Sequence, residues 1–198
     1  HCLSRGLGDV YKRQLLGSTP LLDANGNNAF TITIGTADAT VTAANLNDLN
    51  ALTTVNVNAA NVNTISSSSL SDINTLYTAG GVSGLGDQDI TVSDSGSIAA
   101  GTLTTITAAN GSGTLTASSA ATVTGTAAEI IAAFALELSE DAVTISGPTI
   151  SFFPSVALTV NSGTATLAEA RTLDGLTTGV VTATIADTRV CDLVGSNG

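Results

Sequence analysis

The chain of 198 residues contains no Met and no Trp, and it has only two Tyr and four Phe. A core with so few aromatic rings must be built from small aliphatic side chains, which suits thin, stacked layers better than one large globule. Because no initiator Met is present, we expect the chain to be a piece of a longer protein. No apolar run approaches the roughly 18 residues that a membrane-spanning helix needs, so we expect no membrane insertion.

Positive charge is scarce and gathers near the start of the chain. Residues 4–14, SRGLGDVYKRQ, hold Arg5, Lys12 and Arg13, which are three of the five basic residues. Read back into codons, this stretch resembles an adapter used to prepare sequencing libraries. We therefore treat residues 1–14 as an adapter-derived artefact and expect no structure from them. This exclusion also sets aside the single His, the single Lys and one of the two Cys.

Residues 15–198 are strongly acidic. Arg171 and Arg189 are their only basic residues, against fifteen acidic ones, which leaves a formal charge of −13. Nucleic acids and anionic membranes are held mainly by Lys and Arg, so the charge argues against nucleic acid as a partner. Without His or Lys, the common forms of serine-type catalysis lack their base. Cys191 has no partner for a disulfide and is expected to be a buried apolar side chain.

A short β-branched tag recurs along the chain, and apolar residues follow it at constant offsets. A spacing of three residues places side chains on one stripe of a helix, whereas strands need a spacing of two. The copy after Leu167 is shifted by one residue, and the copy after Ile150 is interrupted by Pro154. Offsets of plus five, plus eight and plus eleven occur after Val41 (Leu46, Leu49, Leu52), Ile65 (Leu70, Ile73, Leu76), Ile98 (Leu103, Ile106, Ala109) and Val123 (Ala128, Ile131, Phe134).

Each copy predicts a strand, a short helix and a second strand. Hydroxyl side chains that can cap a helix stand before the apolar stripes: Thr42, Ser66 to Ser69, and Thr124 or Thr126. The runs after the stripes alternate or cluster as strands do: VNVN from Val55, TLTA from Thr114, AVTIS from Ala142 and VVTATI from Val180.

The repeat spacing leads to a prediction of the fold. Tags lie 24, 33, 25, 27 and 17 residues apart, within or near the range of about 20 to 45 residues typical of solenoid repeats. Because one short helix cannot bury its stripe alone, we expect neighbouring units to align their tags into one continuous ladder. We therefore predict a β-rich α/β repeat, a parallel β-solenoid with a short helix in most coils. Its expected parts are a ragged leading segment (15–29), solenoid repeats (30–188) with ragged sections near 80–88 and 148–154, and a frayed end (189–198).

Two stretches, TVTGTAAEIIAAFAL (122–136) and LTVNSGTATLAEARTLDGLTTGVVTATIADT (158–188), resemble the tandem repeats of very large secreted or cell-surface proteins of bacteria, especially cyanobacteria. The likeness covers most of residues 30–188. Because that family is adhesive or surface-layer-like, the resemblance implies an extracellular or cell-surface location. It also implies a structural or adhesive role, with glycans, other surface proteins or copies of the same chain as partners. The family offers no catalytic residues to carry over.

One acidic cluster suggests a possible calcium site. Asp87, Asp89 and Asp94 lie close together in DQDITVSD, and Ca²⁺ takes six to eight oxygen ligands. Three carboxylates without a Gly-anchored loop are fewer than a dedicated site needs, so a solvated strand edge is favoured. Members of the resembling family that bind calcium carry GGxGxDxxx runs, and this chain has none. We therefore assign no metal or cofactor site, with a calcium-stabilised secreted module left as an alternative.

A polysaccharide-acting enzyme on a β-helix is the other alternative. Glu137, Glu140 and Asp141 in ELSED have the spacing of a glycosidase pair, but also that of an exposed helix end, which is favoured because no aromatic platform is near. A lyase would need cations, and only Arg171 and Arg189 in one groove beside carboxylates would supply them. No catalytic residue is assigned, and we expect the chain not to be an enzyme.

Two further stretches are interpreted as connections. GGVSGLGD (80–87) has the glycine content of a phosphate loop but no Lys, so a flexible connection between coils is favoured. Phe152 and Phe153 could form an exposed patch, but we expect them to fill the coil in which Pro154 interrupts the helix.

Overall fold

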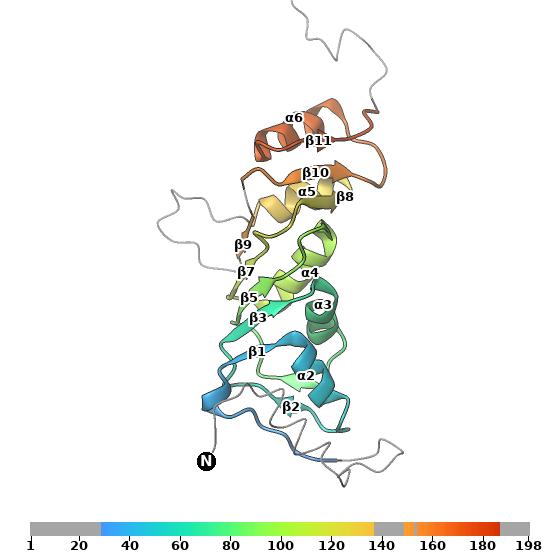
Figure 1. Ribbon diagram of the computed structural model, residues 1–198. Coiled ribbons are helices and arrows are strands. Elements are labelled where there is room, and N and C mark those ends of the chain that lie inside the picture. Colours follow the sequence, from blue (N-terminus) through green and yellow to red (C-terminus); the bar gives the residue numbers. More distant parts are fainter. Residues whose placement is uncertain (1–28, 137–148, 153, 187–198) are drawn as a thin grey trace, which may run out of the picture.

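The computed structural model describes residues 29–136, 149–152 and 154–186. Within these ranges, short strands and helices stack into an elongated array that the chain ascends in order from blue to red (Figure 1). The helices are the short 3-10 helix η1 (Thr36–Asp38), α2 (Ala43–Asn50), α3 (Leu70–Thr78), α4 (Ala100–Asn110), α5 (Ala127–Phe134) and α6 (Leu167–Leu176). The strands are β1 (Thr40–Thr42), β2 (Val57–Asn58), β3 (Thr64–Ser68), β4 (Val82–Ser83), β5 (Asp89–Val92), β6 (Ser97–Ala99), β7 (Thr114–Thr116), β8 (Thr122–Gly125), β9 (Thr149–Ser151), β10 (Ala157–Val160) and β11 (Val181–Thr182).

The strands form three parallel sheets. Their orders are β1-β3-β5-β7-β9, β11-β10-β8-β6 and β2-β4. Every pair joins segments that are distant in sequence, as in the pairing of Thr40 with Thr64 and of Leu158 with Val181. We call each stretch of one to three strands together with the helix that follows them a unit; the units cover 40–50, 57–78, 82–110, 114–134 and 149–176.

The helices form a row on one side of the array. Each of α2 to α6 contacts the next, and in Figure 1 they lie beside the strands of the five-stranded sheet. No helix in the described residues is long and apolar enough to cross a membrane.

The starts of α2, α3 and α5 follow the predicted capping chemistry, whereas α4 begins after Ala99 without a side-chain cap. The hydroxyl of Thr42 accepts a hydrogen bond from the backbone N–H of Asn45 at 3.2 Å, and that of Ser69 accepts one from Asp72 at 3.1 Å. At Thr126 the cap is reciprocal, because the Glu129 side chain also accepts the Thr126 backbone N–H. These groups satisfy backbone donors that a helix leaves free in its first turn.

The core consists of small aliphatic side chains, as predicted. Its main column follows the five-stranded sheet, where one buried residue per strand pairs with the next: Val41, Ile65, Ile90, Leu115 and Ile150. A second column, Ile98, Val123, Leu158 and Val181, follows the four-stranded sheet. The aromatic exception is a stacked pair, Phe134 and Phe152, with ring centroids 4.4 Å apart. Phe152 is therefore buried, as expected, whereas Phe153 lies outside the described residues.

The prediction of a β-rich parallel β-solenoid is wrong. The described residues form an α/β fold in which the parallel sheets are open, neither closed nor curled, and five α-helices accompany them. The physical reason is that a helix takes one side of each unit, so that helices hold more residues than strands. The two-stranded sheet consists of β2 and β4 only. In the described part of the chain, no later strand extends it.

The expected single ladder of tags is also wrong. Val41 and Ile65 lie in the five-stranded sheet, but Ile98 and Val123 lie in the four-stranded one, because β5 adds a strand before β6 in the third unit. The Leu167 tag is not a strand residue and instead begins α6.

The predicted stripes are confirmed in α3, where Leu70, Ile73 and Leu76 are all buried. In α5 the first two positions of the stripe are displaced by one residue: Ala127 and Ile130 are buried in place of Ala128 and Ile131. Phe134 is buried as predicted.

Several expected segments can be compared with the described ranges. Residues 80–88, predicted to be ragged, contain the two-residue strand β4 and are otherwise irregular, although the side chain of Gln88 is buried. The segment boundaries at 14, 188 and 189, the AVTIS run from Ala142, Pro148 and Cys191 lie outside the described residues.

Candidate functional site

The three aspartates of DQDITVSD are used separately. Asp94 Oδ2 accepts the backbone N–H of Leu70 at 2.7 Å, which caps α3 from the next unit along the chain. Asp89 Oδ1 accepts the N–H of Thr114 at 3.3 Å, and Asp87 Oδ1 accepts the side-chain N–H of Gln88 at 2.7 Å. Among the described residues, no three His, Cys, Asp or Glu side chains come together as a group that could hold a metal ion.

The acidic side chains at two helix starts are held by backbone hydrogen bonds. The backbone N–H and then the hydroxyl of Thr126 lower the pKa of Glu129, and Thr166 does the same to Glu169. Glu129 is exposed and Glu169 is half-buried. Glu137, Glu140 and Asp141, the candidate glycosidase pair with its neighbour, lie outside the described residues.

A buried polar network joins the second and third units. The Asn110 side chain is fully buried; its Nδ2 donates to the Gln88 carbonyl at 2.7 Å, and its Oδ1 accepts the Gln88 N–H at 3.1 Å. The Tyr77 hydroxyl donates to the same Asn110 oxygen at 2.8 Å. Gln88 Nε2 reaches back to the Val62 carbonyl at 3.0 Å. Gly113 permits this close approach, since a Cβ there would overlap the Gln88 carbonyl oxygen and the Asn110 amide.

The same network predicts a loss of stability at alkaline pH. Burial, and secondly the negative charge of Asp87, raise the pKa of Tyr77 well above its usual value of about 10. A raised pKa means that the fold favours the neutral phenol, so its contribution is complete below about pH 10 and is lost as the pH rises above that value. We expect the free energy of unfolding to fall with pH in this alkaline range, as measured by urea denaturation.

Tyr77→Phe is the matched variant for this prediction. It should be less stable than the parent at neutral pH, because Asn110 Oδ1 loses a donor, but it should lack the Tyr77 part of the alkaline decline. An equal alkaline slope in both proteins would show that Tyr77 is not the group responsible.

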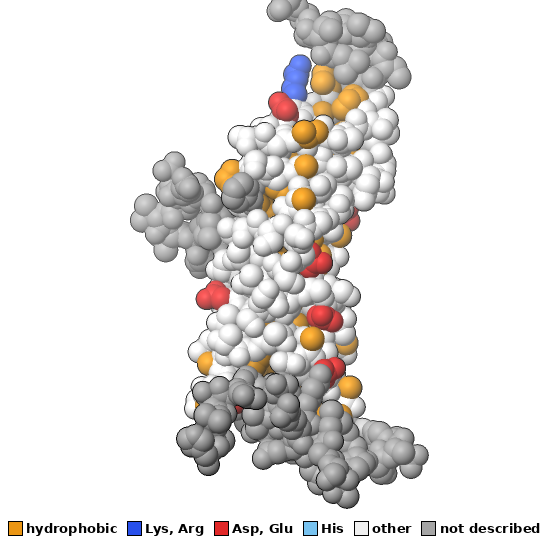
Figure 2. Space-filling view, in the orientation of Figure 1, with side chains coloured by type: hydrophobic (Ala, Val, Ile, Leu, Met, Phe, Trp, Pro, Cys, Tyr) orange, Lys and Arg blue, Asp and Glu red, His pale blue; other side chains and the backbone are white. Residues whose placement is uncertain are grey.

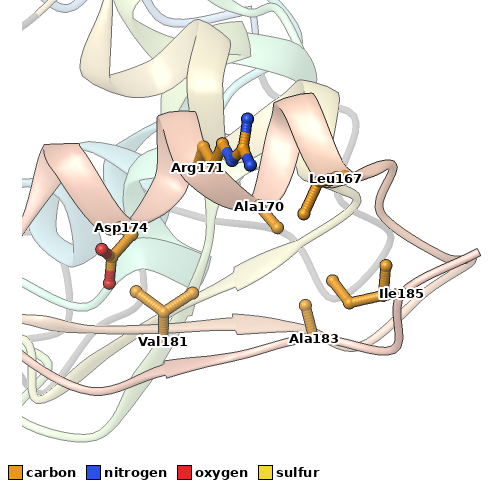
Figure 3. A pocket seen from close by; sticks show the side chains of 7 residues that line it. All are labelled: Leu167, Ala170, Arg171, Asp174, Val181, Ala183 and Ile185. Atoms are coloured by element: carbon orange, nitrogen blue, oxygen red, sulfur yellow. The ribbon is translucent and has the colours of Figure 1, made fainter. Parts of the chain in front are cut away.

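An open hollow of about 360 Å³ lies between α6 and residues 181–185. Figure 3 shows Leu167 and Ala170 of α6 pointing toward Val181, Ala183 and Ile185, while the guanidinium of Arg171 points away from them. Asp174 stands at the edge of the hollow, one helical turn from Arg171. Arg171 is the only Lys or Arg among the described residues, and Arg189 lies outside them. The hollow is therefore the exposed edge of the core, and its walls are mainly aliphatic.

A second hollow, of about 410 Å³, lies at the starts of α4 and α5. Its walls include Thr124, Thr126, Glu129 and Asn161. The Glu129 carboxylate that faces it already accepts the N–H and O–H of Thr126 at 2.8 and 3.0 Å. The polar groups here thus serve the start of α5.

The outward face of the five-stranded sheet carries hydroxyl side chains. Side chains alternate between the two faces of a strand, so the residues on either side of the buried column point outward. They are Thr40, Thr42, Thr64, Ser66, Asp89, Thr91, Thr114, Thr116 and Ser151, all exposed or half-buried. We call this set the hydroxyl face. Figure 2 shows one side of the array, on which acidic side chains lie singly and not in one patch.

Neither the polar network nor the hydroxyl face was predicted from the sequence. A signal for the network was present, because Asn110 follows Leu103, Ile106 and Thr107 on one helical stripe. The hydroxyl face was signalled by TVT, TIS and TLT at four of its five strands, since TIS occurs twice, and in each case hydroxyl residues flank a central aliphatic residue. Comparison of the chain with protein-family models, with curated proteins and with solved structures finds no match.

Proposed function

We propose that the chain is a non-catalytic structural or adhesive repeat segment of a large extracellular or cell-surface protein. The observation that supports this most is the way each unit is built onto its neighbour. Parallel strand pairing and two buried aliphatic columns run from unit to unit along the array. A fold of this kind can be lengthened by adding units without a change in the contacts within each one.

Polar side chains reinforce the same connections between units. Ser68 Oγ accepts the backbone N–H of Ala43 at 2.9 Å, and Asn47 Nδ2 donates to the carbonyl of Asp72 at 2.9 Å. Asp94 and the Asn110 network extend the pattern into the next units. These groups fix the spacing of the units, which is what a stiff spacer or a display surface requires.

Charge and surface chemistry support an extracellular adhesive role. The acidic chain repels its own copies at low salt and stays dispersed, whereas salt screens that repulsion. The hydroxyl face offers donors and acceptors with little charge. Glycans, other surface proteins and copies of the same chain are the partners we propose for it.

Binding and turnover assays on one set of polysaccharides test this function. We expect the labelled full chain to be retained on beads that carry surface glycans or the chain itself, with no release of reducing ends or unsaturated sugars. Arg171→Ala should leave retention unchanged, because its guanidinium points away from the hollow that Arg171 borders. Turnover that Arg171→Ala abolishes would favour a polysaccharide-acting enzyme instead.

A further inference from the structure

We propose that the hydroxyl face binds the surface of ice. The inference deepens the proposed adhesive function by naming a solid that the face fits, and it rests on that function. Two rows of outward side chains run across the strands. Thr40, Thr64, Asp89 and Thr114 form one row, and Thr91, Thr116 and Ser151 form the aligned part of the other.

The spacing of these rows is set by the backbone. Neighbouring strands lie about 4.8 Å apart, and residues two apart on one strand lie about 6.6 Å apart. The result is a two-dimensional lattice of hydroxyl and methyl groups, and the oxygen atoms of hexagonal ice repeat at similar spacings on a prism face. A bulge between Ile65 and Ser68 interrupts the second row between Ser66 and Thr91. Before the bulge, the hydroxyls of Thr42 and Ser66 make hydrogen bonds within the protein, so the regular part of the second row begins at Thr91.

The side chains of this face are largely ordered before any ligand arrives. Thr is branched at Cβ, which restricts its first side-chain torsion, and most of the face is Thr. The inner strands β3, β5 and β7 are paired on both sides, and their inward residues Ile65, Ile90 and Leu115 are fully or almost fully buried. Little conformational entropy therefore remains to be lost when a rigid surface docks.

Charge favours ice as the occupant. The chain is strongly acidic, yet Asp89 is the only charged residue in the hydroxyl face. One of its oxygens is directed to the N–H of Thr114 within the sheet. A neutral surface loses little hydration energy on meeting a neutral crystal, whereas buried charges would oppose docking. No outward residue of the described face is aromatic, so it lacks the rings on which a crystalline polysaccharide would stack.

Ice affinity of the labelled full chain tests the proposal directly. We expect the chain to partition into a slowly growing ice hemisphere and to lower the freezing point below the melting point. Thr91→Tyr places a bulky side chain at the centre of the face while keeping a residue that strands favour. It should weaken ice binding by at least about tenfold, as loss of a central contact does at other interfaces. Asp89→Thr removes the one charge and should strengthen binding.

Thr182→Tyr is the matched control, because Thr182 is exposed on β11 of the four-stranded sheet. It should bind ice as the parent does, and circular dichroism should show all variants folded. Three results would overturn the proposal: a folded parent chain excluded from ice, equal losses in Thr91→Tyr and Thr182→Tyr, or preference for crystalline polysaccharide over ice. Retention on glycan beads is scored separately, so failure on ice leaves the adhesive function to stand or fall by its own assay.

Discussion

Replacement of Leu115 by Ala is expected to lower the free energy of unfolding by about 3 to 5 kcal/mol. Leu115 is fully buried in β7, where it pairs with Ile90 on one side and Ile150 on the other. The truncation removes apolar contacts and leaves a cavity that backbone pairing on both sides prevents from closing. Urea denaturation followed by circular dichroism measures the change.

Val180→Ala provides the comparison. Val180 is also aliphatic but 71% exposed, so its truncation should change the free energy of unfolding by no more than about 0.5 kcal/mol. If the two truncations proved equally mild, the buried column would not be what holds the units together.

Replacement of Asn110 by Ala is expected to lower the free energy of unfolding by about 3 kcal/mol or more. The change leaves the N–H and carbonyl of Gln88 and the Tyr77 hydroxyl without the partner they share. Each buried polar group deprived of its hydrogen bond costs about 1 to 3 kcal/mol. The second and third units should be affected first, because Asn110 and Gln88 of the third unit bind Tyr77 and Val62 of the second.

Asn56→Ala is the matched control, since Asn56 is exposed and should tolerate the change within about 0.5 kcal/mol. A double-mutant cycle with Tyr77→Phe then isolates the hydroxyl contact, for which a coupling of about 0.5 to 3 kcal/mol is expected. Additive effects of the two substitutions would mean that Tyr77 and Asn110 act independently, against the geometry of the network.

The helices were the most predictable elements. Their stripes and caps are local signals, so Thr42, Ser69 and Thr126 could be recognised as helix starts from neighbouring residues alone. The strand at TLT was predicted for the same reason, although the run from Val180 forms a strand of only two residues.

The assembly of the elements was not predictable from the same signals. A buried β-branched residue gives the same sequence pattern in either sheet. The sequence therefore did not reveal that Ile98 and Val123 lie in the four-stranded sheet, whereas Val41 and Ile65 lie in the five-stranded one. The third unit has one strand more than the second: β5 continues the five-stranded sheet with Ile90, so the tag residue Ile98 falls in β6, which begins the four-stranded sheet. The prediction of a β-rich solenoid failed at this level.

The candidate sites show a related limit. Proximity in sequence grouped Asp87, Asp89 and Asp94, but their partners lie in different units, and each carboxylate binds a separate donor. The network of Asn110 and Gln88 depends on contacts across 22 residues, and no local pattern gives that distance.

The direction of strand pairing has a mechanical consequence. Backbone hydrogen bonds between strands run along the long axis of the array, so a force pulling on its two ends would load them one unit at a time. Thr40 is separated from its partner Thr64 by 24 residues. Releasing one such stretch would lengthen the chain by about 80 Å at about 3.3 Å per residue. Under tension the segment would therefore lengthen in successive steps, one unit at a time, and each step would absorb mechanical work before any covalent bond breaks.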